Sequence, residues 1–178
     1  LTAAAIAAIA LALPAFAQER FTTTVSGKGP DVILIPGLAS SGAVWDATVK
    51  QLAPTHRVHV LQVKGFAGEP AGLNAEGPVL APLVDDVAAY AAKLEKPAII
   101  GHSIGGLIAL EVAAKQPAKV DRILVVDALS FYSLLFGPQA TPAMAKPQAE
   151  LMRTQTIAMA DAQFAAGQDQ TMAMMVKT

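Results

Sequence analysis

The sequence of 178 residues contains no cysteine, which excludes disulfide bonds, thiolate metal sites and a lipidated N-terminal cysteine. Its strong neutral metal ligands are three histidines, His56, His59 and His102. His56 and His59 stand three positions apart in a predicted strand, which directs their side chains to opposite faces. We therefore predict no metal site, and a core or surface role for His56 and His59.

Charged and aromatic residues are also scarce, at 15% and 5% of the chain, and the formal net charge is −1. Lysine and arginine are scattered and do not alternate with aromatic residues, so nucleic acid is not a predicted partner. Hydrophobic residues make up 53% of the sequence, enough for one substantial core in a single domain. No feature of the sequence sets an oligomeric state.

Residues 1–17 differ in composition from the rest of the chain. They carry no charge, are dominated by Ala, Leu and Ile, and end in Ala15-Phe16-Ala17 before Gln18. An apolar segment closed by an A-x-A site is typical of a secretory signal peptide, and the segment is short for a membrane anchor. We predict cleavage after Ala17, no stable membrane insertion afterwards, and an exported protein, periplasmic or secreted. The sequence begins at Leu1 without a positive n-region, so we expect its start to be truncated.

Strand and helix patterns alternate from residue 20 to Asp127. Short apolar or alternating runs predict strands, and runs with apolar residues three and four apart predict helices. This alternation favours a mostly parallel sheet with flanking helices, an α/β fold. The predicted strands are 21–26, 32–35, 57–63, 98–100 and 120–126, and the predicted helices are 43–52, 79–94 and 104–115. Val44, Trp45, Val49 and Leu52 are expected to share the buried face of the first helix.

Residues 128–178 have a different pattern, with no convincing buried strand and with all six methionines of the chain. Leu151 and Ala158 have helical spacing, with Met152 and Met159 beside them. Flexible methionine side chains suit a lid over a substrate pocket, and they suit an ordinary helical core equally well. In either case we predict a helical segment inserted after the strand that ends at Asp127.

A glycine–serine motif lies between a predicted strand and a predicted helix. Gly101, Ser103 and Gly105 form a G-x-S-x-G run, with apolar residues 98–100 before it and helix 104–115 after it. This context is that of a nucleophile elbow, in which a tight turn gives the serine a positive φ and exposes its hydroxyl. The two glycines pass so close to each other that a Cβ would collide. At the helix N-terminus, the N–H of Ile104 is placed to stabilise an oxyanion.

Three motifs in order resemble the α/β-hydrolase fold in its compact form with a helical cap. They are Ile33-Leu34-Ile35-Pro36-Gly37-Leu38-Ala39-Ser40-Ser41, Lys64-Gly65-Phe66-Ala67-Gly68 and Gly101-His102-Ser103-Ile104-Gly105-Gly106. The resemblance covers a core at 18–127, with 128–178 as the cap. It implies that Ser103 is the nucleophile, that the backbone N–H groups of Leu38 and Ile104 form the oxyanion hole, and that no cofactor is needed.

The chain departs from the family pattern in two places. Pro36 stands where many relatives have histidine, which leaves the main-chain donor of Leu38 intact. The second departure is larger, because the family's catalytic histidine follows the nucleophile and no histidine occurs after His102. Asp127 stands at a strand end where some relatives have their catalytic acid, but a turn or cap carboxylate is the interpretation we favour for it. We expect a chain truncated at its C-terminus, inactive as it stands, whose catalytic histidine lies beyond Thr178.

These features predict an enzyme, a serine hydrolase that cleaves a carboxylic ester or related small acyl substrate through an acyl-serine intermediate. An aminopeptidase, a lactonase, a cofactor-free peroxidase or a C–C hydrolase would fit the same residues. A non-catalytic binding protein on this scaffold is the alternative of a different class.

Overall fold

The computed structural model describes residues 20–129, 133 and 137–159. The predicted signal peptide, 1–17, lies outside the described residues. The chain divides into two units, residues 1–128 and 129–178. In the part of the chain that is described, no helix is long and apolar enough to cross a membrane.

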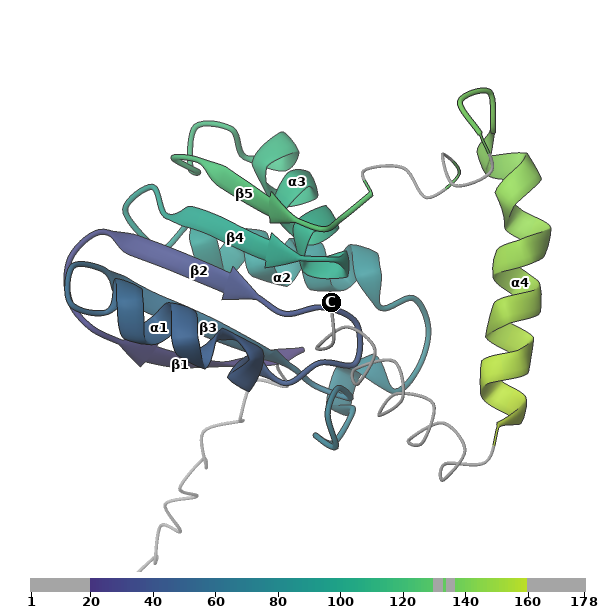
Figure 1. Ribbon diagram of the computed structural model, residues 1–178, viewed down its shortest axis with the longest axis horizontal. Coiled ribbons are helices and arrows are strands. Elements are labelled where there is room, and N and C mark those ends of the chain that lie inside the picture. The colour runs from purple at the N-terminus through teal and green to yellow at the C-terminus, as the bar shows by residue number, and fades with distance from the viewer. Residues whose placement is uncertain (1–19, 130–132, 134–136, 160–178) are drawn as a thin grey trace, which may run out of the picture. The chain divides into compact units, whose positions relative to one another are not determined.

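The first unit is built on a five-stranded sheet with the strand order β1-β3-β2-β4-β5. The strands are β1 (Phe21–Ser26), β2 (Asp31–Ile35), β3 (Arg57–Val63), β4 (Ala98–His102) and β5 (Ile123–Val126). β1 pairs antiparallel with β3, and the other three pairings are parallel. The predicted mostly parallel α/β sheet is therefore confirmed, with β1 at its edge (Figure 1).

Helices cover both faces of this sheet, as Figure 1 shows. α1 (Asp46–Leu52) lies on one face, and α2 (Leu80–Ala91) and α3 (Ile104–Lys115) lie on the other. β2 is buried along its whole length, and its side chains alternate between the two cores. Ile33 and Ile35 join the core under α2 and α3, whereas Val32 and Leu34 join the core under α1. Each such buried side chain stabilises the fold by roughly 1.5–3 kcal/mol.

The predicted helix 43–52 is wrong at its start. A 3₁₀ helix, η1 (Gly42–Trp45), comes first and is capped by the Ser41 side chain, and α1 follows it. Because a 3₁₀ helix has three residues per turn, side chains shift around the axis relative to an α-helix. Trp45 is buried as predicted, but Val44 is 48% exposed instead of sharing that face.

Two other predicted elements are longer than those observed. The helix predicted to reach Leu94 ends at Ala91, because the N–H groups of Lys93 and Leu94 bond to carbonyls three residues back and tighten the last turn. The strand predicted from Val120 begins at Ile123. A turn precedes it, closed by the bond from Lys119 N–H to Gln116 O.

The second unit, described by itself, contains α4 (Pro142–Ala158), so a helix does lie in the segment predicted to be helical. Of its apolar side chains, Met144, Leu151 and Met152 are each about half exposed. The cap role of 128–178 stays a prediction, and residues 160–178 lie outside the described part of the chain.

Candidate active site

Ser103 has the backbone conformation that a nucleophile elbow requires. It lies between the end of β4 and the start of α3, with φ +52° and ψ −120°. A non-glycine residue adopts this region only at a cost, so the surrounding structure must hold it there. The carbonyl of Ser103 accepts from the N–H groups of Gly106 (2.9 Å) and Leu107 (3.3 Å), which starts α3 immediately after the turn. The side chain is thereby placed at a helix N-terminus, where free N–H groups favour negative charge.

The two glycines of the motif are required by close approach. A Cβ on Gly101 would overlap the carbonyl of Gly105. A Cβ on Gly105 would overlap the carbonyl of Ile35 and lie 2.7 Å from that of Pro36. Both contacts are with backbone, which cannot move aside as a flexible side chain can. The elbow is therefore packed directly against the end of β2.

The loop that follows β2 lies against the elbow and contains Leu38, the second predicted oxyanion donor. The loop turns sharply, with φ +56° at Ala39 and a bond of 3.2 Å from Ser40 N–H to Gly37 O. The Leu38 side chain is 64% exposed. A Cβ on Gly37 would lie 3.5 Å from the Cβ of Ser103, so the residue before Leu38 lies close to Ser103.

His102, the residue before Ser103, directs its ring toward the same loop. A Cβ on Gly37 would lie 2.8 Å from Nδ1 and 3.3 Å from Cε1 of His102. The His102 ring therefore packs on Gly37. Sequence reasoning missed this contact, because nothing in the spacing of 37 and 102 indicates it.

Asp127 lies beside the elbow at the end of β5. The backbone N–H of Ser103 donates to the carbonyl of Val126 at 2.9 Å, and Asp127 is the next residue. Its side chain is exposed, and its φ is +46°, a conformation that aspartate adopts more readily than most residues. The structure thus places Ser103, Leu38, Ile104 and Asp127 at the carboxyl ends of neighbouring parallel strands.

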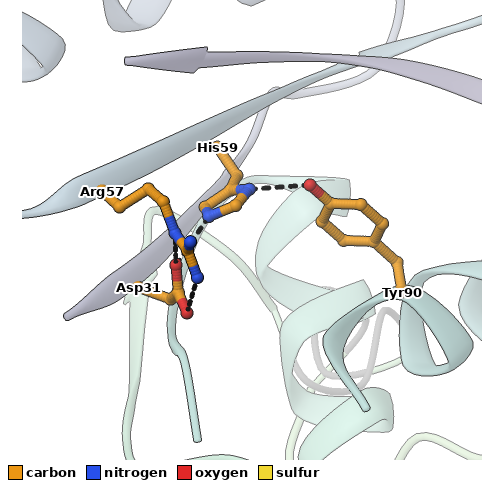
Figure 2. A network of polar contacts seen from close by, with 4 residues as sticks. All are labelled: Asp31, Arg57, His59 and Tyr90. Atoms are coloured by element: carbon orange, nitrogen blue, oxygen red, sulfur yellow. Dashed lines mark hydrogen bonds and ion pairs between the residues drawn. The ribbon is translucent and has the colours of Figure 1, made fainter. Parts of the chain in front are cut away.

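The other two histidines lie away from this site. His56 precedes β3 and pairs with the Thr55 hydroxyl at 2.8 Å, and it is partly buried. His59 is only 3% exposed and belongs to a network with Asp31, Arg57 and Tyr90, shown in Figure 2. Asp31 begins β2 and Arg57 begins β3, so the network lies at the amino ends of the parallel strands. About 13 Å of strand separates Asp31 from the end of β2.

This network is a connected cluster of polar side chains. Arg57 donates to both oxygens of Asp31, at 2.5 and 2.8 Å, and His59 Nε2 lies 2.8 Å from Asp31 Oδ1. His59 Nδ1 lies 2.7 Å from the Tyr90 hydroxyl. The bonds from Arg57, followed by that from His59, outweigh burial and lower the pKa of the Asp31 carboxyl to about 2. Burial raises the pKa of Tyr90. The geometry gives the cluster a structural role and no access to Ser103.

A shallow cavity of about 210 Å³ lies on the α1 side of the sheet. Thr24, Ser26, Asp46 and Gln62 supply its polar lining, and no residue of the elbow takes part. Gln62 is already bonded to the N–H of Gly42 at 2.8 Å. Across the described ranges, no group of three or more histidine, aspartate or glutamate residues is arranged to hold a metal ion.

The comparison with known families agrees with this geometry. A family model described as alpha/beta hydrolase fold matches residues 30–171. The chain therefore belongs to the α/β-hydrolase fold family, as the motif resemblance predicted.

Individual relatives cover part of the chain. The pimeloyl-[acyl-carrier protein] methyl ester esterase of Vibrio campbellii is 40% identical over 100 residues, 56% of this chain and 37% of that protein. The esterase of the same name from Aeromonas hydrophila is 35% identical over 108 residues, 61% of this chain and 39% of that protein. Among solved structures, an N-formylmaleamic acid deformylase from Pseudomonas putida matches with a TM-score of 0.54 and 29% identity, covering 61% of this chain and 42% of its own. The chain thus spans about two-fifths of the length of these relatives.

Proposed function

We propose that this chain carries the nucleophile of a serine hydrolase that cleaves a carboxylic ester or a related acyl substrate. The observation that carries the proposal is the backbone of Ser103, held at φ +52° between β4 and α3 with Gly37 against it. Such strain has no stabilising purpose of its own, and it exposes the hydroxyl at the carboxyl edge of the sheet. Sequence identity of 40% and 35% to two proteins named as methyl ester esterases supports an ester as the substrate class.

In the proposed mechanism, Ser103 Oγ attacks the acyl carbonyl carbon. The backbone N–H groups of Leu38 and Ile104 donate to the oxygen as it becomes negative, and the helix N-terminus adds its dipole. Collapse of the tetrahedral intermediate expels the alcohol and leaves an acyl-serine, which water then hydrolyses. No step requires a metal or an organic cofactor.

The serine needs a base that accepts its proton and passes that proton to the leaving group, which departs as the alcohol. His56 and His59 lie apart from the elbow, and His102 packs on Gly37. We propose that the base is a residue outside these 178. The two esterases named above support this, because each is more than twice as long as the segment that it shares with this chain. Asp127 is proposed as a turn residue, with the catalytic acid as its alternative role. We also propose that residues 128–178 form the cap. Separately, residues 1–17 support the proposal that the protein is exported.

The test is hydrolysis of p-nitrophenyl acetate and of short fatty acid methyl esters by the full-length protein, with Ser103→Ala as the matched variant. We expect turnover that falls by several orders of magnitude in Ser103→Ala. Turnover that is unchanged in Ser103→Ala would show that the reaction does not use this serine. Absence of turnover in the wild type on every ester would favour the binding protein.

A further inference from the structure

Gly37 is a glycine because of space and not because of its backbone angles. The φ of Gly37 is not positive, so a residue with a side chain could adopt the same backbone conformation. The space beside its Cα is filled by the His102 ring, whose Nδ1 would lie 2.8 Å from a Cβ at that position. Gly37 itself is buried, whereas the following residue, Leu38, is 64% exposed. The His102 ring and Gly37 thus form a close pair beneath the exposed part of the loop.

This contact bears on the proposed oxyanion donor. The N–H of Leu38 belongs to the peptide unit that starts at Gly37, so a displacement of Gly37 moves that N–H relative to Ser103. The other side of the loop is fixed by Gly105, which packs on the carbonyls of Ile35 and Pro36. Residues on both sides of the nucleophile therefore hold the loop.

The two supports differ in kind. Gly105 meets backbone atoms at the end of β2, which are fixed by the sheet. His102 meets Gly37 through a side chain, so the support can be removed or reshaped without breaking the sheet. Of the two contacts that hold the loop after β2, the one made by the His102 side chain can therefore be altered by substitution.

We propose that His102 is a positioning residue, whose imidazole ring presses on Gly37 and so sets the Leu38 N–H at the distance from Ser103 that the oxyanion requires. This inference rests on the proposed function, in which Leu38 is an oxyanion donor. It assigns His102 no proton transfer, and it explains why position 37 has no side chain.

A double-mutant cycle on the full-length protein tests the pairing, with p-nitrophenyl acetate as the probe substrate. Gly37→Ala should lower kcat by about 10- to 100-fold, with KM within about threefold, because a misplaced oxyanion donor acts on the transition state. His102→Ala should lower kcat by a similar factor. The double variant, Gly37→Ala with His102→Ala, should show a fold-loss in kcat smaller than the product of the two single fold-losses. The new methyl group then occupies space that the ring has left. Fully multiplicative losses would overturn the inference.

His102→Asn separates positioning from proton transfer. Asparagine keeps an atom at the place of Nδ1 but cannot act as a base near neutral pH. We expect His102→Asn to restore kcat to within about fivefold of the wild type. A loss as large as that of His102→Ala, with a changed pH profile, would make His102 a base and overturn the positioning role.

A second readout does not depend on activity. Hydrogen–deuterium exchange of residues 36–42 should be faster in His102→Ala and close to wild type in His102→Asn, because the ring or its replacement restrains the loop. Unchanged exchange in His102→Ala would overturn the inference even if the protein hydrolyses no ester. Conversely, an inactive wild type in which the exchange differs as expected would defeat the proposed function and leave the His102–Gly37 support standing.

Discussion

The backbone N–H of Ser103 donates to the carbonyl of Val126 at 2.9 Å, which ties the tight turn at Ser103 to the end of β5. His102 and Val126 are also partners in the parallel register of β4 and β5. The strained turn is therefore held from two sides, by β5 through this bond and by β2 through Gly105. The elbow's conformation thus depends on strands that lie on either side of β4 in the sheet.

Asp127, which follows this bond, is expected to act as a turn residue. Its φ of +46° is tolerated by aspartate and asparagine and costs alanine about 1 kcal/mol. Asp127→Asn should keep kcat within about threefold of the wild type, and Asp127→Ala should lower the unfolding free energy by about 1 kcal/mol with a similar kcat. Urea denaturation of the full-length protein measures the unfolding free energy, and ester kinetics measure kcat. A fall in kcat of about a thousandfold or more in Asp127→Asn would instead make it the catalytic acid.

Gly105→Ala should damage the elbow itself. The added methyl group would overlap the carbonyl of Ile35 and crowd that of Pro36, and neither can move without shifting β2. We expect a loss of roughly 1–3 kcal/mol of unfolding free energy, with loss of ester hydrolysis. Gly68→Asn is the matched control, because Gly68 has φ +82° with open space around it and asparagine tolerates that conformation. Equal effects of the two substitutions would contradict the packing described for Gly105.

The Asp31 network predicts that the unfolding free energy falls at acid pH. The Asp31 carboxyl is buried, and the Arg57 bonds lower its pKa from 3.8 to about 2. A carboxyl with a lowered pKa contributes stability above its unfolded value, and this contribution is lost as the pH falls. About 2 kcal/mol should therefore be present above about pH 4 and disappear between pH 4 and pH 2.

Asp31→Asn tests this contribution. It should lower the unfolding free energy near pH 7 by about 2 kcal/mol or more, because His59 stays buried without its ionised partner. The difference between variant and wild type should shrink below pH 4. Tyr90→Phe, which removes the hydrogen bonds of the Tyr90 hydroxyl with His59 and Thr23, should cost about 1–2 kcal/mol without this pH dependence. A constant difference between Asp31→Asn and wild type from pH 7 to pH 2 would show that the carboxyl's ionisation is not involved.

The proposed export makes a prediction at a single peptide bond. If the gene is expressed in a bacterium with its own leader, the mature protein should begin at Gln18, after the Ala15-Phe16-Ala17 site. Intact mass of the periplasmic fraction measures this. Ala17→Asp should block processing, because the site requires a small residue. A cytosolic product that retains residues 1–17 would contradict export.

The sequence predicted the elements and the elbow because their signals are local. The apolar run before Gly101 and the helix after Ser103 are adjacent in the chain, and so are the constraints that give Ser103 its positive φ. Contacts across the sheet carry no such signal. The bond between Asp31 and His59 depends on the register of β2 and β3, and the His102–Gly37 contact depends on how a loop folds back. Val44 was misplaced because the periodicity of 43–52 does not reveal that the helix starts as 3₁₀.

The most direct test of the central claim is covalent labelling of the full-length protein with a fluorophosphonate probe, followed by peptide mass mapping. A nucleophilic serine beside an oxyanion hole reacts at phosphorus and retains the phosphonyl group. We expect one adduct per chain, located on Ser103, and no adduct in Ser103→Ala. An unlabelled wild-type protein, or an adduct that persists in Ser103→Ala, would contradict the assignment of Ser103 as the nucleophile.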